Sequence, residues 1–385
     1  MNIITGLALA LSCGFASSLN IIINNDDGWA TANIREFYKA LKVDGHNAFI
    51  VAPVEQQSGQ GGRTVFSAEA HLSRPGQWNT VPAGALSFGT DPMDSHIWYY
   101  NGTPAAVTFF ALDYLVRHKG IFGGAEPDLI VTGPNEGSNA GPFLFTLSGT
   151  IGAAYAAVGR GIPAVAFSAT NILDRKYTTV NSTDDDPAAI VGKLAARVVK
   201  QLADKSKNGS KNRRILPYAY GININFPYIG VSSLGSEPAC LDPTFVHSRL
   251  TGGATTNIAV YDEETGLFSY INNFTSPGVN TCINGDCLLP GETDVIKECK
   301  TSISVFTVDY DAPTCGGAAK VRELLDGLVE NPSGGESTKS VGTETGDATS
   351  KMTPIPVETG AAERLGLNGA MVVIIGMSFG AIALL

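Results

Sequence analysis

The feature that most constrains the fold of this chain is a regular alternation of short apolar runs with helix-like segments between Leu19 and about Leu328. Short runs that are apolar throughout are typical of strands buried on both faces of a parallel sheet. Each run ends in Asn, Asp, Gly, Pro or Ser, which favour turns. The predicted strands are 20–23, 48–52, 129–132, 164–168 and 220–225, and the predicted helices are 33–43, 104–118, 150–159 and 187–204. This pattern predicts an α/β fold with a Rossmann-like, doubly wound and mainly parallel sheet.

Beyond Ile229 the sequence changes to shorter, Thr- and Gly-rich β-like pieces, and 302–309 alternates as a strand does. We interpret this part as a β-rich embellishment of the same domain, which we expect to span 19–328. A chain of 385 residues with 44% hydrophobic residues is long enough to bury a core of that size.

The cysteines gather in the embellishment. Cys13 lies in the apolar leader, and the other five are Cys240, Cys282, Cys287, Cys299 and Cys315. In an oxidising compartment this clustering favours two disulfides and one remaining thiol, with the pairing left open. A zinc site is the alternative, but no CxxC spacing supports it.

Both chain ends carry patterns typical of targeting. An apolar run over 1–16 ends in Gly14-Phe15-Ala16, which predicts a signal peptide over 1–18. Residues 331–360 are rich in Ser, Thr and Gly, which predicts a disordered stalk. Residues 361–385 combine small residues, a polar spacer and an apolar tail, which predicts a GPI-attachment signal. A membrane helix is the alternative, but the tail is short of the ~20 residues needed to cross a bilayer.

We therefore expect a secreted, extracellular protein, GPI-anchored to the plasma membrane or cell wall. N-glycosylation sequons are consistent with this route, and they stand at Asn101, Asn181, Asn208 and Asn273. The net charge of -10 and the pI near 5.0 argue against binding of a nucleic-acid polymer, which requires clustered Lys and Arg.

The first predicted strand ends in Asn24-Asn25-Asp26-Asp27-Gly28. Adjacent carboxylates at a strand end repel each other unless a hard cation or hydrogen bonds relieve them. In an open α/β sheet, ligands bind at this edge. On these residues alone, a metal site and a surface turn are equally good interpretations.

Two later loops at strand ends suit an anion. The loop 54–64 is Gly-rich but matches neither GxGxxG nor a P-loop, so a nucleotide cofactor is disfavoured. Ser148-Gly149-Thr150 opens a helix of small residues, which suits a phosphate at a helix N-terminus. Simple N-capping by Ser148 and Thr150 is the alternative.

Taken together, these segments resemble the SurE family of survival-protein nucleotidases and acid phosphatases, including its secreted fungal members. The resembling pieces keep the family's order over most of 19–310: they are 25–28, 51–53 with 58–59, 101–105, 133–139, 148–154 and 222–227. The resemblance implies one metal at the carboxyl edge of the sheet, with ligands at Asp26, Asp27, Ser58 and Asn135. It also implies substrate or phosphate contacts, which we place at Asn25, Gly59, Asn139, Ser148, Gly149 and Thr150.

Two departures from the family pattern lie close to these residues. Ala106-Val107 replaces the usual Asp-Cys, and Thr132-Gly133-Pro134-Asn135 replaces the usual Ser-Gly-Ile-Asn. Pro134 fixes its own φ and removes a donor, so we expect the loop that presents Asn135 to differ in shape.

The predicted function is hydrolysis of small phosphate monoesters, nucleoside monophosphates among them, by metal-activated water, as in an acid phosphatase or a 5'- or 3'-nucleotidase. An oxygen-only ligand set favours Mg²⁺ or Mn²⁺. Asp26 or Asp27 would relay the proton, and an aspartyl-phosphate intermediate and a homodimer are left open. The five histidines form no paired motif.

Two other functions compete with this prediction. A non-catalytic cell-surface or cell-wall binding module would explain the anchor and the stalk, but it has no need of the four implied metal ligands. An esterase would use Ser58 or Ser148 as its nucleophile, but neither serine lies in a G-x-S-x-G motif.

Overall fold

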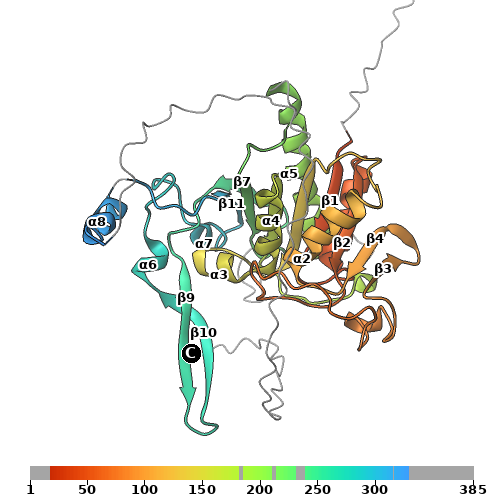
Figure 1. The fold of residues 1–385 in the computed structure, drawn as a ribbon, viewed down its shortest axis with the longest axis horizontal. Helices are drawn as coiled ribbons and strands as arrows, with labels where there is room; N and C mark the ends of the chain where they lie inside the picture. Colours follow the sequence, from red (N-terminus) through yellow and green to blue (C-terminus); the bar gives the residue numbers. More distant parts are fainter. Residues whose placement is uncertain (1–17, 182–184, 210–213, 231–238, 315, 329–385) are drawn as a thin grey trace, which may run out of the picture. The chain divides into compact units, whose positions relative to one another are not determined.

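Figure 1 shows the computed structural model of the chain, which describes residues 18–328 apart from 182–184, 210–213, 231–238 and 315. The described residues up to Val321 belong to one compact unit, and 322–328 belong to a second. The predicted stalk, GPI signal and all of the signal peptide except Ser18 lie outside the described residues, and so does Cys315.

The first unit is built on a nine-stranded sheet with the order β3-β4-β2-β1-β5-β6-β7-β11-β8. Neighbouring strands run parallel except for the pairs β3–β4 and β7–β11. The strands are β1 (Asn20–Asn24), β2 (Asn47–Pro53), β3 (Phe88–Asp91), β4 (Asp94–Tyr100), β5 (Leu129–Glu136), β6 (Ala164–Ala169), β7 (Tyr220–Phe226), β8 (Thr244–His247) and β11 (Lys300–Thr307).

Helices cover both faces of this sheet (Figure 1). They are α1 (Ala32–Val43), α2 (Pro104–Phe109), the π-helical η2 (Phe110–Val116), α3 (Pro142–Leu147), α4 (Gly149–Gly159) and α5 (Pro187–Gly209). Short 3₁₀ turns, η1 (Gln77–Asn79) and η3 (Tyr177–Thr179), and the helices α6 (Pro277–Asn280), α7 (Glu292–Val295) and α8 (Gly317–Leu324) complete the helical elements.

The inner strand β1 shows how the sheet separates two cores. Ile21 and Ile23 pack with residues of α1 and α5 on one face, and Ile22 packs with residues of α2 and α4 on the other. All three isoleucines are fully buried, and each such burial contributes about 1.5–3 kcal/mol. A strand that is apolar at every position is therefore explained by burial on both faces.

The predicted α/β architecture is confirmed, and the five predicted strands and four predicted helices are present with ends shifted by a few residues. The predicted strand over 302–309 is also present, as β11, and it pairs antiparallel with β7. The hairpin β3–β4 at the sheet edge was not predicted. Its first strand has only four residues of partly exposed FGTD, which carry no clear period.

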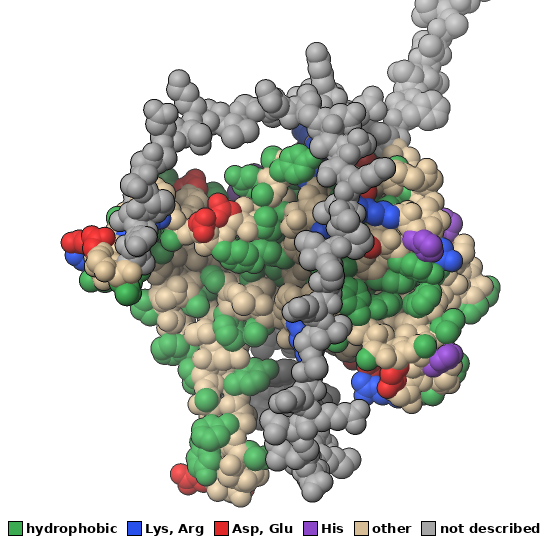
Figure 2. Space-filling model, viewed as in Figure 1, with side chains coloured by type: hydrophobic (Ala, Val, Ile, Leu, Met, Phe, Trp, Pro, Cys, Tyr) green, Lys and Arg blue, Asp and Glu red, His purple; other side chains and the backbone are tan. Residues whose placement is uncertain are grey.

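A second hairpin lies outside the main sheet. It consists of β9 (Thr255–Asp262) and β10 (Leu267–Thr275), which form a two-stranded sheet of their own. Figure 2 shows hydrophobic side chains gathered along it, among them Tyr261, Phe268 and Tyr270, which are all exposed. The embellishment after Ile229 is thus β-rich, as predicted.

The two predicted disulfides are present in this region. They join Cys240 to Cys299 and Cys282 to Cys287. Among the described residues, no helix has both the length and the apolar character that a membrane span requires.

Candidate active site

The candidate site begins at the turn that follows β1. The Asn25 side chain holds this turn, because its Oδ1 accepts from the Gly28 N–H at 3.0 Å and its Nδ2 donates to the Gly28 carbonyl at 3.1 Å. Gly28 has a φ of +109°, which side chains rarely adopt, so a glycine is required here. The turn presents the carboxylates of Asp26 and Asp27, both of which are buried.

The Asp26 carboxylate lies at the N-terminus of α4. It accepts a hydrogen bond from the Thr150 hydroxyl, and the backbone N–H groups of Gly149 and Thr150 also face it. A Cβ at Gly149 would lie 2.9 Å from the Asp26 Cβ, so the glycine permits this close approach. Burial raises the pKa of Asp26, and the helix N-terminal donors partly offset this rise.

The Asp27 carboxylate is held from the end of β5. Its Oδ2 accepts from the Glu136 N–H at 2.9 Å, and the Gln56 amide lies 3.5 Å from its Oδ1. Burial, followed by the charges of Asp26 and Glu136, raises the pKa of Asp27 well above its usual range. No Lys, Arg or His within the described part of the chain forms an ion pair with either aspartate.

Asn135 is connected to Asp26 through Thr150. The Thr150 hydroxyl contacts Asp26 Oδ1 and also lies 3.3 Å from Asn135 Oδ1, while Asn135 Nδ2 donates to the Gly137 carbonyl at 2.8 Å. Two acceptor oxygens thus converge on one hydroxyl that carries a single proton. The pairing of β5 with β6 shifts register between Thr132 and Asn135, which is where the sequence predicts that Pro134 alters the loop.

The Gly-rich loop after β2 reaches the same place. The Gln57 N–H donates to the Asp26 carbonyl at 2.6 Å, and Ser58 and Gly59 follow as exposed residues. Within the described residues, no hydrogen bond joins the Ser58 hydroxyl to either carboxylate. The structure therefore brings the loop to the aspartates, and the role of Ser58 as a ligand stays a prediction.

The same loop packs directly on α4. The Gly61 N–H donates to the Leu147 carbonyl at 2.9 Å. A Cβ at Gly152 would lie only 1.9 Å from the Gly61 carbonyl oxygen, so the loop and the helix approach each other where neither has a side chain.

Two predicted phosphate contacts have structural partners of their own. Ser148 Oγ accepts from the Ile151 N–H at 3.2 Å, which is the N-capping use that the sequence left open. Asn139 Nδ2 donates to Ser168 Oγ at 2.8 Å, and the Asn139 N–H donates to Asn225 Oδ1 at 2.7 Å. Both residues therefore fix the loops that surround the aspartates.

Sequence reasoning missed Glu136 and the asparagines of β7. Glu136 is part of the segment 133–139 and supplies the N–H that contacts Asp27. Burial, followed by the charge of Asp174, raises the pKa of the Glu136 carboxyl to about 7. Asn223 and Asn225 alternate with apolar residues along β7 and are fully buried. Polar residues at every second position of a strand point to the same face of the sheet, and this was the signal that could have shown that Asn223 and Asn225 lie side by side on one face of β7.

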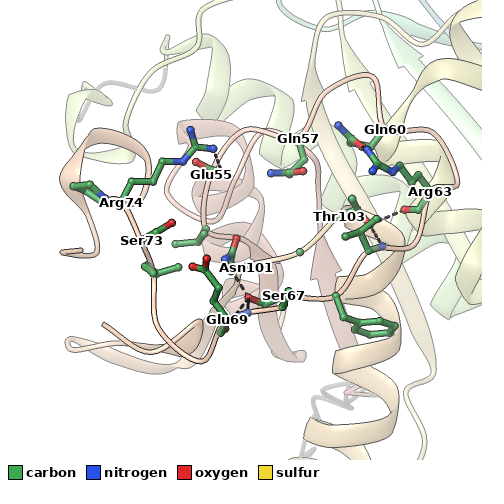
Figure 3. Close-up of a pocket in the computed structure, with 17 residues that line it drawn as sticks. Glu55, Gln57, Gln60, Arg63, Ser67, Glu69, Ser73, Arg74, Asn101 and Thr103 are labelled. Atoms are coloured by element: carbon green, nitrogen blue, oxygen red, sulfur yellow. Dashed lines mark hydrogen bonds and ion pairs between the residues drawn. The ribbon is translucent and has the colours of Figure 1, made fainter. Parts of the chain in front are cut away.

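A pocket of about 560 Å³ lies next to this site (Figure 3). Gln57, whose backbone contacts Asp26, is one of its lining residues. Arg74 and Glu55 form an ion pair at 2.7 Å on one side, and Gln60 and Arg63 lie on the other (Figure 3). The wall is formed by the loops after β2 and β4.

The donor set of the site fits a hard divalent cation. Asp26, Asp27 and Asn135 offer only oxygen atoms, and the two buried carboxylates lack a protein cation among the described residues. In the described residues, no group of three or more His, Cys, Asp or Glu gathers as a metal-binding cluster. A cation here would thus depend on two carboxylates supplemented by neutral oxygen ligands.

Comparisons with known proteins place this geometry in context. The family model described as "Survival protein SurE" matches residues 21–242. An acid phosphatase of Yarrowia lipolytica is 43% identical over 319 residues, which are 82% of this chain and 86% of that protein. A 5'-nucleotidase SurE of Desulfovibrio desulfuricans is 32% identical over 210 residues, which are 54% of this chain and 66% of that protein.

The fold is also found among solved structures. The crystal structure of the SurE protein from Aquifex aeolicus superposes with a TM-score of 0.50 at 18% identity, over 79% of this chain and 98% of that one. At this identity the likeness concerns the fold alone.

Proposed function

The chain belongs to the SurE family and is a hydrolase of phosphate monoesters, and from this premise we propose that it acts with a divalent cation, Mg²⁺ or Mn²⁺, held at Asp26 and Asp27. The observation that carries the proposal is the pair of adjacent, buried carboxylates at the carboxyl end of β1. Burial disfavours the ionised form of both carboxyls, and the charge of Asp26 adds to this effect at Asp27; a cation would reverse that preference.

Asn135 and Ser58 would complete the ligand set. Asn135 Oδ1 shares the Thr150 hydroxyl with Asp26, so it lies within reach of the same space. Ser58 stands one residue after Gln57, whose N–H bonds to Asp26. When bound, the cation would supply a Lewis acid that neutralises charge developing on the phosphate oxygens.

The protein groups around this space have distinct roles in the proposed reaction. The backbone N–H groups of Gly149 and Thr150, at the N-terminus of α4, would bind the phosphate oxygens alongside Asp26. Asp26 or Asp27 would accept the proton released when water attacks phosphorus, since these are the two carboxylates that the turn after β1 presents at the site.

The neighbouring pocket would take the organic part of the substrate. Its volume of about 560 Å³ accommodates a small organic group, and Gln57, Gln60 and Asn101 place amide groups around it. We propose that small phosphate monoesters, nucleoside monophosphates among them, are the substrates, as the acid phosphatase and 5'-nucleotidase relatives suggest.

We also propose that the protein is secreted and carries a GPI anchor. The apolar leader and tail of the sequence support this location. The two disulfides support passage through an oxidising compartment.

The test of this function is p-nitrophenyl phosphate hydrolysis by the purified protein. We expect turnover that disappears on exhaustive chelation and returns when Mg²⁺ or Mn²⁺ is added back. Turnover that survives chelation would refute the metal dependence, whereas a protein that hydrolyses no phosphate monoester with either cation would refute the function itself.

A further inference from the structure

We infer that Glu292 is a positioning residue through which the disulfide-bonded C-terminal segment holds the loop that completes the active site. This loop is the connection 136–150 between β5 and α4, and it includes the short helix α3. The inference rests on the proposed function, because this loop carries the donors that face Asp26 and Asp27. Glu292 lies outside the stretch 21–242 that matches the family model.

Glu292 is fully buried beneath this loop, and its carboxylate uses both oxygens. Oε2 accepts from the Gly141 N–H at 2.9 Å, and Oε1 accepts from Asn223 Nδ2 at 2.9 Å. A third hydrogen bond joins it to the Ser304 side chain of β11. A buried carboxylate in this arrangement fixes the position of each group that it contacts.

The contact with Asn223 extends to the neighbouring part of the loop. Asn223 Nδ2 also donates to the Asn139 carbonyl at 3.2 Å, and the Asn139 N–H donates to Asn225 Oδ1 at 2.7 Å. The segment 139–141 is therefore fixed by Glu292 and by the two asparagines of β7. It lies between Glu136, which contacts Asp27, and the residues that open α4 next to Asp26.

Glu292 is itself held by the C-terminal segment. Its N–H donates to the Arg249 carbonyl at 3.0 Å. The preceding Gly291 packs so closely on Gly252 that a Cβ would lie 1.9 Å from the Gly252 carbonyl oxygen. The same segment is tied by the disulfide between Cys240 and Cys299. The carboxylate is therefore presented to the loop by a preorganised element.

Among the described residues, no partner of Glu292 carries a charge. The charged groups of the surrounding elements have other partners or lie at the surface. Arg249 donates to the Leu289 carbonyl and to Thr251, Asp294 pairs with Lys297, and Lys300 pairs with Glu298. His247, at the end of β8, is exposed. Burial among neutral groups raises the pKa of Glu292 to about 7.

The activity test compares Glu292→Gln with Glu298→Gln, which removes an exposed carboxylate from the same segment. Above about pH 7, where the Glu292 carboxyl is ionised, Glu292→Gln replaces one acceptor by an amide N–H₂ that opposes a donor, so Gly141 or Asn223 must shift. We expect kcat for p-nitrophenyl phosphate to fall about 10- to 100-fold, with a smaller change in KM, because small displacements of catalytic groups are costly. Glu298→Gln should behave as the wild type.

A second readout does not depend on activity. The native protein keeps a proton on Glu292 up to about pH 7, whereas the unfolded chain releases it near 4.5, so this residue makes the wild type less stable as pH rises between these values. A glutamine side chain cannot titrate, so the Tm of the Glu292→Gln protein should lack the decrease with rising pH that Glu292 causes in the wild type. We expect the Tm of the wild type minus that of Glu292→Gln to decrease as pH rises through this window.

Three outcomes would decide against the inference. A folded Glu292→Gln protein with wild-type kcat would show that Glu292 positions nothing, and a Tm equal to that of the wild type at every pH would show that its contacts with Gly141 and Asn223 do not hold the segment in place. If Glu292→Gln does not fold, Glu292→Asp, which keeps the carboxylate but withdraws it, must lower kcat; an unchanged kcat would refute the inference. An inactive wild type would refute the proposed function instead.

Discussion

The contact between the Gly-rich loop and α4 gives a sharp prediction for the substitution Gly152→Ala. The added Cβ would lie 1.9 Å from the Gly61 carbonyl oxygen and 2.8 Å from the Gly62 nitrogen. To restore an ordinary contact of 3.4 Å, the loop must retreat from the helix by about 1.5 Å. Because α4 is anchored in the core by Ile151 and Ala154, whereas Ser58 and Gly59 are exposed, we expect the loop to move.

This retreat would weaken the contact of the loop with Asp26 and carry Ser58 away from the aspartates. A displacement near 1 Å can cost about 10²-fold in rate, so we expect kcat/KM for p-nitrophenyl phosphate to fall by roughly that factor. The matched control is Gly159→Ala at the end of the same helix, where a Cβ would meet nothing within 4 Å. Gly152→Ala with wild-type kcat/KM and an unchanged Tm would refute the placement of this loop in the active site.

Three further predictions concern the site and the location of the protein. Asp27→Asn should lower kcat by orders of magnitude, which steady-state kinetics tests. The metal-free Asp27→Asn protein should unfold at the same or a higher temperature than the wild type, because a buried carboxyl with a raised pKa is removed; calorimetry tests this. Asn101 should carry no glycan, because its Nδ2 donates to Ser67 Oγ at 3.2 Å in the wall of the pocket. The exposed Asn273 should carry a glycan, and mass spectrometry before and after glycan removal distinguishes the two sites. Phosphatidylinositol-specific phospholipase C should release the activity from intact cells, and recovery of a membrane-bound chain that still contains 370–385 would instead establish a tail-inserted protein.

The sequence alone predicted the architecture and the sheet edge at which the residues of the candidate site lie. Runs such as Ile21–Ile23 are apolar at every position, and this local pattern is sufficient to predict a strand buried on both faces. The carboxyl ends of parallel strands meet at one sheet edge, so the turn that carries Asp26 and Asp27 and the loop that carries Asn135 were expected to converge there, and they do.

Only the tertiary structure decided how these residues are supported. Glu292 is 151 residues from Gly141 in the sequence and carries no local motif, yet its carboxylate accepts a hydrogen bond from the Gly141 N–H at the edge of the site. The disulfide partners were likewise undetermined, because spacing along the chain does not fix distances in space.

The close approach of Gly61 to Gly152 is a second feature that local sequence could not predict. Each glycine could be explained locally, the first by a turn and the second by a helix of small residues. Their contact exists only because the loop after β2 and the helix α4 come together over the sheet edge. Periodicity and turn chemistry act between neighbours in the chain, whereas the groups that hold the carboxylates in place come from segments that only folding brings together.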